Sequence, residues 1–181
     1  MLGIIAIGAG VAVGGLLAYA ASRPDEFGVQ RSQEMQAPAE RIFDKVQDFH
    51  AWSAWSPYEK LDPALKRTYS GSERGTGAAY AWDGNNKAGE GRMEIMNVVP
   101  GSKVTIKLDF TRPFEGHNTT EFLMEPRGNM TRVTWAMHGK QKFMMKLFSV
   151  FMNMDNLVGK DFAEGLSNLK RLVETKAVAT T

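Results

Sequence analysis

Strict alternation of apolar and polar side chains along residues 102–110 (SKVTIKLDF) limits the possible folds of this chain more than any other feature. Four apolar residues occupy every second position of this stretch: Val104, Ile106, Leu108 and Phe110. Because successive side chains of a β-strand point to opposite faces, the pattern predicts a strand with one face in a core and the other in water. Half-apolar strands of this kind are typical of antiparallel sheets, whose second face is solvated.

Other segments repeat the two-residue period and are separated by turn residues. They predict further strands in Phe27–Met35, KRTYSG, GAAYAWDG, AGEGRMEIMNVVP, HNTTEFLMEP and MTRVTWAMHG. Pro100-Gly101 and residues 126–129 are predicted to form tight turns between neighbouring strands. The sequence therefore predicts an antiparallel sheet of about seven strands.

Two segments have helical periodicity instead. Ala39–Phe49 begins after Pro38, which favours a helix start, and its apolar residues recur at helical spacing. Gly159–Glu174 carries an apolar stripe along one helical face: Phe162, Leu166, Leu169 and Val173. The order of strand, helix, strands and long helix predicts an α+β fold with the helices packed on one face of the sheet.

The N-terminus contains 20 consecutive residues without a charge, Leu2–Ala21. About 20 apolar residues cross a bilayer as a helix, so the segment is predicted to be a transmembrane anchor. Ala18-Tyr19-Ala20 also fits a cleavage site, and a cleaved signal peptide is the alternative, although the usual basic n-region is missing. The predicted organisation is an anchor at 1–22, a linker at 23–26, a folded domain at 27–176 and a flexible tail at 177–181.

The predicted location is a bacterial cell membrane, held by a single-pass anchor. Arg23 and Arg31 follow the apolar segment, and only the terminal amine precedes it. The positive-inside rule therefore favours a cytoplasmic domain, although two residues leave the side of the membrane open.

Charge and composition exclude several classes of protein. The 22 Lys and Arg residues nearly balance 20 Asp and Glu residues, and no basic run of five or more occurs, so no nucleic-acid partner is expected. The lack of cysteine removes disulfides and thiolate metal sites. His50, His117 and His138 lack metal-ligand spacing, so neither a metal nor a cofactor is expected. The sequence leaves the oligomeric state open.

Five stretches together resemble a known superfamily: residues 31–63, 69–85, 89–95, 131–139 and 159–170. Their order, which includes a Trp-Ser-Pro loop and a Tyr-x-Trp strand, is similar to that of the START-like helix-grip (SRPBCC) superfamily in its polyketide cyclase/dehydrase branch. The resemblance covers Phe27 to Lys176 and implies a curved sheet that grips the C-terminal helix around an internal hydrophobic cavity. Members include lipid carriers, metabolite binders, chaperone activators and cyclases, so the fold alone does not select a function.

Large apolar side chains from separate segments are the candidates for the cavity wall. Trp52 and Trp55 lie in DFHAWSAWSPYEKLDP, a stretch with the composition of a loop, and either line a ligand or close the core. The same choice applies to the other candidates, which are Tyr80, Trp82, Met93, Ile106, Leu108, Phe122, Trp135, Met137, Phe162 and Leu166.

A Met/Phe-rich segment, Lys142 to Val158, precedes the C-terminal helix. It holds more apolar side chains than one helical face can bury, among them Phe148 and Met152. Because methionine adapts to varied shapes, the segment suits a gate for a hydrophobic ligand or a contact with a bilayer. An ordinary core helix and a protein-binding patch are the alternatives.

Catalysis has few candidate residues. A cyclase or dehydratase needs a polar group in the cavity that exchanges a proton with the substrate, and Glu115, His117 and Asn118, with Tyr80 as a donor, are the candidates. Solvated strand ends are the alternative for these residues. The leading hypothesis is membrane-tethered binding of a lipid or other hydrophobic small molecule. A cyclase-like enzyme is the alternative, and a protein-interaction domain is a second alternative.

Overall fold

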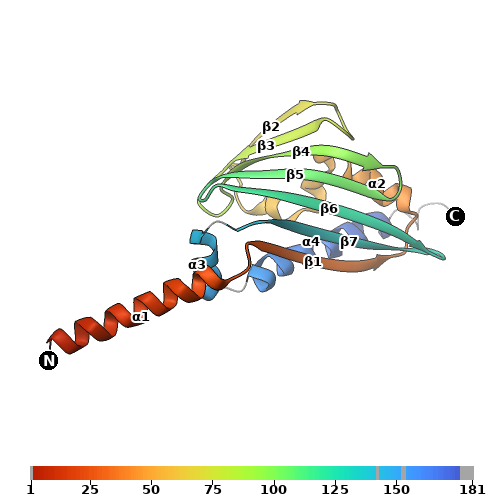
Figure 1. Cartoon of the computed structure of the whole chain (residues 1–181). Coiled ribbons are helices and arrows are strands. Elements are labelled where there is room, and N and C mark those ends of the chain that lie inside the picture. Colours follow the sequence, from red (N-terminus) through yellow and green to blue (C-terminus); the bar gives the residue numbers. More distant parts are fainter. Residues whose placement is uncertain (1, 142, 152–153, 176–181) are drawn as a thin grey trace.

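The computed structural model describes the backbone of residues 2–141, 143–151 and 154–175, and their side chains except those at positions 2–9, 12, 144, 148, 151 and 154. The predicted tail at 177–181 lies outside the described residues. Two layers form the domain, a curved antiparallel sheet and a set of helices across one of its faces (Figure 1). This confirms the predicted α+β helix-grip architecture.

Seven strands form one antiparallel sheet in the order β1-β7-β6-β5-β4-β3-β2. Their bounds are β1 Glu26–Met35, β2 Lys66–Gly71, β3 Ala78–Asp83, β4 Glu90–Val99, β5 Lys103–Arg112, β6 Gly116–Arg127 and β7 Met130–Lys140. β1 forms one edge of the sheet and pairs with β7, whereas all other neighbouring strands are consecutive in the chain. The inward positions of β5 are buried as the alternation predicts, with Val104 and Ile106 both fully buried.

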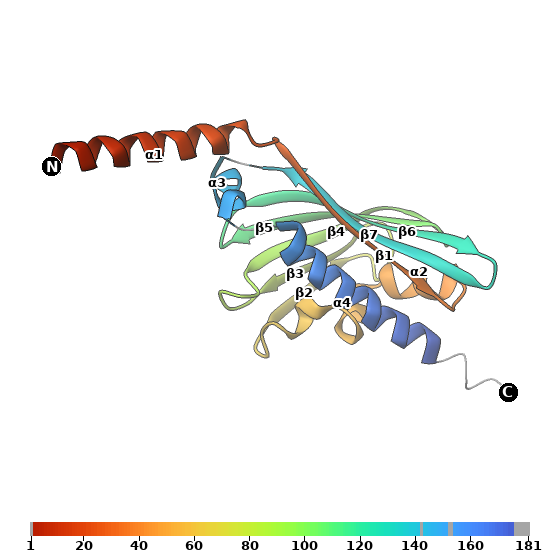
Figure 2. The ribbon, with the colours of Figure 1, turned by 90° about the horizontal axis from the view of Figure 1, so that it is seen from below.

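The helices cover the inner face of the sheet. α4 (Met154–Glu174) runs along β1 and contacts β7 (Figure 2). α2 (Ala39–Val46) contacts β5 and β6. The apolar stripe of α4 faces the sheet, since Phe162, Leu166, Leu169 and Val173 are all buried.

The first domain helix is shorter than the predicted range Ala39–Phe49, because α2 ends at Val46. The carboxylate of Asp48 accepts a hydrogen bond of 2.9 Å from the backbone N–H of His50 and caps a new 3-10 helix, η1 (Phe49–Ala54). A second 3-10 helix, η2 (Pro57–Lys60), follows. The Trp-rich segment is therefore two short helical turns, and it brings Trp52 and Trp55 under the sheet with exposed fractions of 3% and 0%.

Helix α1 (Leu2–Ser22) extends away from the domain, beside the short helix α3 (Phe143–Phe151) (Figure 1). An ion pair between Lys146 of α3 and Asp25 ties α3 to the segment that leads into β1. Over the parts of the chain whose side chains are described, no helix reaches the length and apolar content of a membrane span, so the predicted anchor has no support there.

Candidate ligand-binding cavity

A cavity of about 900 Å³ lies between the sheet and the first half of α4. Its wall comes from strands β3 to β7, from η1 and η2, and from the starts of α3 and α4. Most of the predicted wall residues face it: Trp52, Tyr80, Trp82, Met93, Leu108, Trp135, Met137 and Phe162. The sheet supplies most of these side chains because alternate residues of each strand point inward.

Other predicted wall residues belong to the solid core instead. Trp55, Ile106, Phe122 and Leu166 are buried but do not line the cavity. Trp55 packs edge-on against Phe122 and Trp135, with ring centroids 5.9 and 5.6 Å apart.

The predicted gate is described only in part. Met145 of α3 lines the cavity, and Leu157 and Val158 at the start of α4 complete this side of the wall. The side chain of Phe148 and the whole of Met152 lie outside the described residues.

Inside the cavity, a buried carboxylate forms a network that the sequence did not reveal. The side chain of Glu59 in η2 is 7% exposed and forms an ion pair of 2.7 Å with Arg67 of β2. Its second oxygen accepts a hydrogen bond of 2.7 Å from the hydroxyl of Tyr80. Burial and this bond raise the pKa of Tyr80 above its ordinary value. Tyr80 is therefore a neutral donor that is already engaged by Glu59.

A second polar pair connects η2 with α4. The hydroxyl of Tyr58 interacts with the carboxylate of Asp161, and both residues line the cavity. Burial raises the pKa of Tyr58, and the negative charge of Asp161 adds to this effect. Burial also raises the pKa of Asp161, and repulsion from the negative charge of Glu164 raises it further. These pairs had no sequence signal, because two single residues in a 3-10 turn and a helix show no periodic pattern.

The predicted polar groups Glu115, His117 and Asn118 lie together at the mouth of the cavity, at the turn into β6. The side chains of Glu115 and His117 are 60% and 61% exposed. His117 Nδ1 lies 2.7 Å from a carboxylate oxygen of Asp109, and this hydrogen bond raises the pKa of His117 above 6.5. Both groups thus face solvent at the rim and not the interior.

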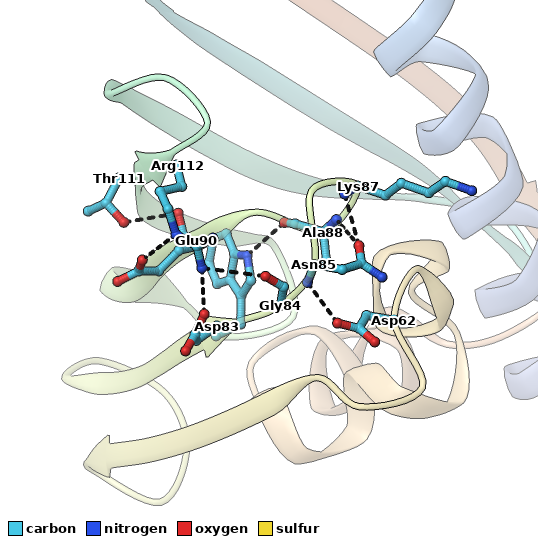
Figure 3. Close-up of polar contacts among 10 residues, drawn as sticks. Asp62, Asp83, Gly84, Asn85, Lys87, Ala88, Glu90, Thr111 and Arg112 are labelled. Carbon is cyan, nitrogen blue, oxygen red and sulfur yellow. Dashed lines mark hydrogen bonds and ion pairs between the residues drawn. The ribbon is translucent and has the colours of Figure 1, made fainter.

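The turn between β3 and β4 contributes Lys87 and Ala88 to the cavity lining. Figure 3 shows the polar contacts that hold this turn. Asp62 accepts a hydrogen bond of 2.7 Å from the backbone N–H of Asn85, which holds the turn against the segment after η2. The indole N–H of Trp82 donates to the carbonyl of Ala88 at 3.0 Å. Arg112 forms ion pairs with the acidic residues that end β3 and begin β4. The turn therefore fixes the ring of Trp82 in the cavity wall.

No group of three side chains that could ligate a metal ion occurs in the described part of the chain. The cavity instead combines an apolar wall with a few internally paired polar groups, which is the usual composition of a small-molecule site.

Gly165 of α4 is required by the packing of the cavity wall. A methyl group there would lie 2.7 Å from Cζ3 of Trp135 and 3.1 Å from Cδ of Pro57. We expect Gly165→Ala to lower the free energy of unfolding by about 1 kcal/mol, because overpacking outweighs the better helix propensity of alanine. Urea denaturation measures this loss, and Ser167→Ala at an exposed position of the same helix should be neutral or slightly stabilising. Equal stabilisation by both substitutions would contradict the packing argument.

Sequence comparison assigns the chain to a family whose fold and site match this description. A family model described as polyketide cyclase / dehydrase and lipid transport matches residues 26–174. The chain belongs to this family, as the resemblance to the SRPBCC superfamily had indicated. No curated protein shows a significant sequence match to the chain.

Solved structures share the fold at low sequence identity. A crystal structure of a protein from Chromobacterium violaceum has a TM-score of 0.58 at 16% identity, with 84% of this chain and 99% of the other covered. One from Mesorhizobium loti gives 0.61 at 12% identity, with coverage of 82% and 98%. DynU16, encoded in the dynemicin biosynthetic locus, gives 0.59 at 14% identity, and the match spans 85% of this chain but 49% of DynU16. These likenesses establish the fold.

Proposed function

We propose that this protein binds a hydrophobic small molecule, such as a lipid, in the cavity between the sheet and α4. The observation that carries the proposal is a cavity of about 900 Å³ whose wall is mostly aromatic and aliphatic. Of the carboxylates in it, Glu59 is held by Arg67 and Tyr80, and Asp161 interacts with Tyr58, so these two groups offer little to a charged ligand. An apolar molecule removes this surface from water, which favours binding.

We further propose that the N-terminal segment tethers the binding domain to a membrane. The sequence supports this, because Leu2–Ala21 has no charge and a helix of this length spans about 30 Å, the thickness of a bilayer core. Apolar side chains near the cavity mouth add support, since Phe114 and Leu157 line it and are 50% and 53% exposed. Vesicle flotation tests the tether: the full chain should float with the vesicles, and a chain beginning at Glu26 should not.

Native mass spectrometry with organic extraction tests the binding function. The protein purified from a bacterial host should carry a bound molecule of defined mass that organic solvent releases. A folded protein without any bound molecule, which also fails to take up added lipid, would contradict the proposal. Denatured protein extracted in parallel provides the control for lipid that adheres nonspecifically.

A cyclase-like reaction is the second candidate, and the buried pair of Tyr80 and Glu59 favours it. In this role the hydroxyl of Tyr80 would exchange its hydrogen bond to Glu59 for one to the developing enolate, which such a reaction must stabilise. Glu115 and His117 are exposed, whereas Tyr80, the donor predicted from the sequence, is buried in the cavity wall beside Glu59. Chemical conversion of the bound molecule during incubation, followed by mass, would favour the enzyme over a binding protein.

A further inference from the structure

Two buried polar atoms in the cavity wall lack a hydrogen-bond partner among the described residues. They are the hydroxyl oxygen of Thr120 on β6 and the indole Nε1 of Trp135 on β7. The two residues are 3% and 2% exposed, and both line the cavity. Buried polar groups in folded proteins are nearly always hydrogen-bonded, so a pair without partners at a cavity indicates a place for a ligand atom or a water molecule.

The arrangement of the strands brings these two groups together. Thr120 pairs with Met137 and Phe122 pairs with Trp135, so Thr120 and Trp135 are diagonal neighbours on the inner face of β6 and β7. Diagonal neighbours in a sheet lie about 7–8 Å apart, which lets a single ligand group between them contact both side chains. They therefore form one candidate recognition point and not two separate ones.

The orientation of the Trp135 ring is fixed by α4. The ring stacks on Phe162 with centroids 4.1 Å apart and planes at 8°, and its Cζ3 edge faces the backbone at Gly165. In an indole, Nε1 lies on the edge opposite Cζ3 and Cε3. The N–H is thus turned away from Gly165 and held without freedom to find another partner, which makes it a preorganised donor.

The charges around the cavity determine the chemical class of the group that fits. An indole N–H only donates and a threonine hydroxyl donates or accepts, so the partner must be a hydrogen-bond acceptor. Neither donor carries a charge. The basic residues that line the cavity, Lys87, Arg112 and Lys140, are exposed at its rim, so an anionic group bound between the two buried donors would lack a cationic partner from these residues. A neutral oxygen such as that of a ketone or ester meets both conditions.

We propose that the cavity recognises a neutral hydrophobic molecule through one carbonyl-type oxygen, which accepts hydrogen bonds from Nε1 of Trp135 and the hydroxyl of Thr120. The inference rests on the proposed binding function and adds the chemical class of the ligand. The apolar wall holds the body of the molecule, and the two donors select its polar atom and set its orientation.

Two probes of the same shape test this inference. Benzophenone and diphenylmethane differ by a carbonyl in place of a methylene group. We expect the full chain in lipid nanodiscs, measured against empty nanodiscs, to bind benzophenone about thirtyfold more tightly, the ratio that two net hydrogen bonds of about 1 kcal/mol each supply. The indole N–H resonance of Trp135 should shift on adding benzophenone and shift less with diphenylmethane. Diphenylacetate, which carries a charge, should bind more weakly than benzophenone.

Two variants locate the effect. Thr120→Val keeps the shape of the side chain and removes the hydroxyl, so it should reduce the preference for benzophenone without lowering the melting temperature of the ligand-free protein. Trp135→Phe removes the N–H and should reduce the preference further. Equal affinity of the wild-type protein for both neutral probes, as expected if the two groups only bind water, would overturn this inference and leave the proposed function intact. Failure of both probes to bind would count against the proposed function itself.

Discussion

Trp55→Ala is expected to lower the free energy of unfolding by about 3–5 kcal/mol, the usual loss when a fully buried large aromatic side chain is truncated. Trp55 is 0% exposed and does not line the cavity. Its ring contacts those of Trp52, Phe122 and Trp135, with centroids 4.8, 5.9 and 5.6 Å apart. The substitution therefore leaves a void beside three aromatic rings that pack against Trp55.

Urea denaturation of the full chain, followed by the circular dichroism of the sheet, measures this loss. Trp55→Phe is the matched control, because it keeps an aromatic ring and should lose clearly less stability than Trp55→Ala. A loss below 1 kcal/mol, or a loss of affinity without a loss of stability, would mean that Trp55 serves the ligand and not the core.

The strands were predictable because their signal is local. The alternation around Ile106 and Leu108 reports directly which side chains face inward, and a strand with one buried face needs no further information. The first domain helix was predicted too long. α2 ends at Val46, and the side chain of Asp48 caps the separate 3-10 helix η1 instead of continuing α2. Such a competition between a side chain and the backbone is decided by a single hydrogen bond, which periodicity does not show.

The apolar part of the cavity wall was also predictable, but the division between wall and core was not. Trp52 lines the cavity and Trp55 does not, although both lie in the same loop and are equally buried. Which of the two rings faces the cavity depends on how this segment packs under the sheet, and the spacing of residues along the chain does not show that. Glu59 and Asp161 escaped prediction for a related reason: each is an isolated acidic residue whose partner, Arg67 or Tyr58, comes from another element.

The paired carboxylates explain how an apolar cavity tolerates acidic residues. Removing Glu59 from water is unfavourable, and the ion pair with Arg67 together with the hydroxyl of Tyr80 offsets that penalty. Because these interactions are made within the protein, the ligand is not needed to satisfy them. The donors of Thr120 and Trp135, which have no partner among the described residues, differ in this respect, since binding of an acceptor would supply one.

The double substitution Met93→Trp and Leu108→Trp is expected to reduce ligand binding by more than about tenfold, equivalent to 1.4 kcal/mol or more of binding free energy. Met93 on β4 and Leu108 on β5 are paired across the two strands, and both line the cavity with exposed fractions of 8% and 9%. Two indole rings side by side would occupy space that the ligand needs. The protein itself should remain folded, because the rings enter an existing void instead of a packed core.

Lys107→Trp is the matched control for this double variant, because it places the same ring on the outer face of β5, where the side chain of Lys107 is 52% exposed. The amount of co-purified molecule per protein, measured by native mass spectrometry, should fall in the double variant and stay at the wild-type level in the control. Thermal unfolding of both variants verifies that they are folded. An unchanged amount of co-purified molecule in a folded double variant would place the binding site outside this cavity. The cavity would then no longer support the proposed function.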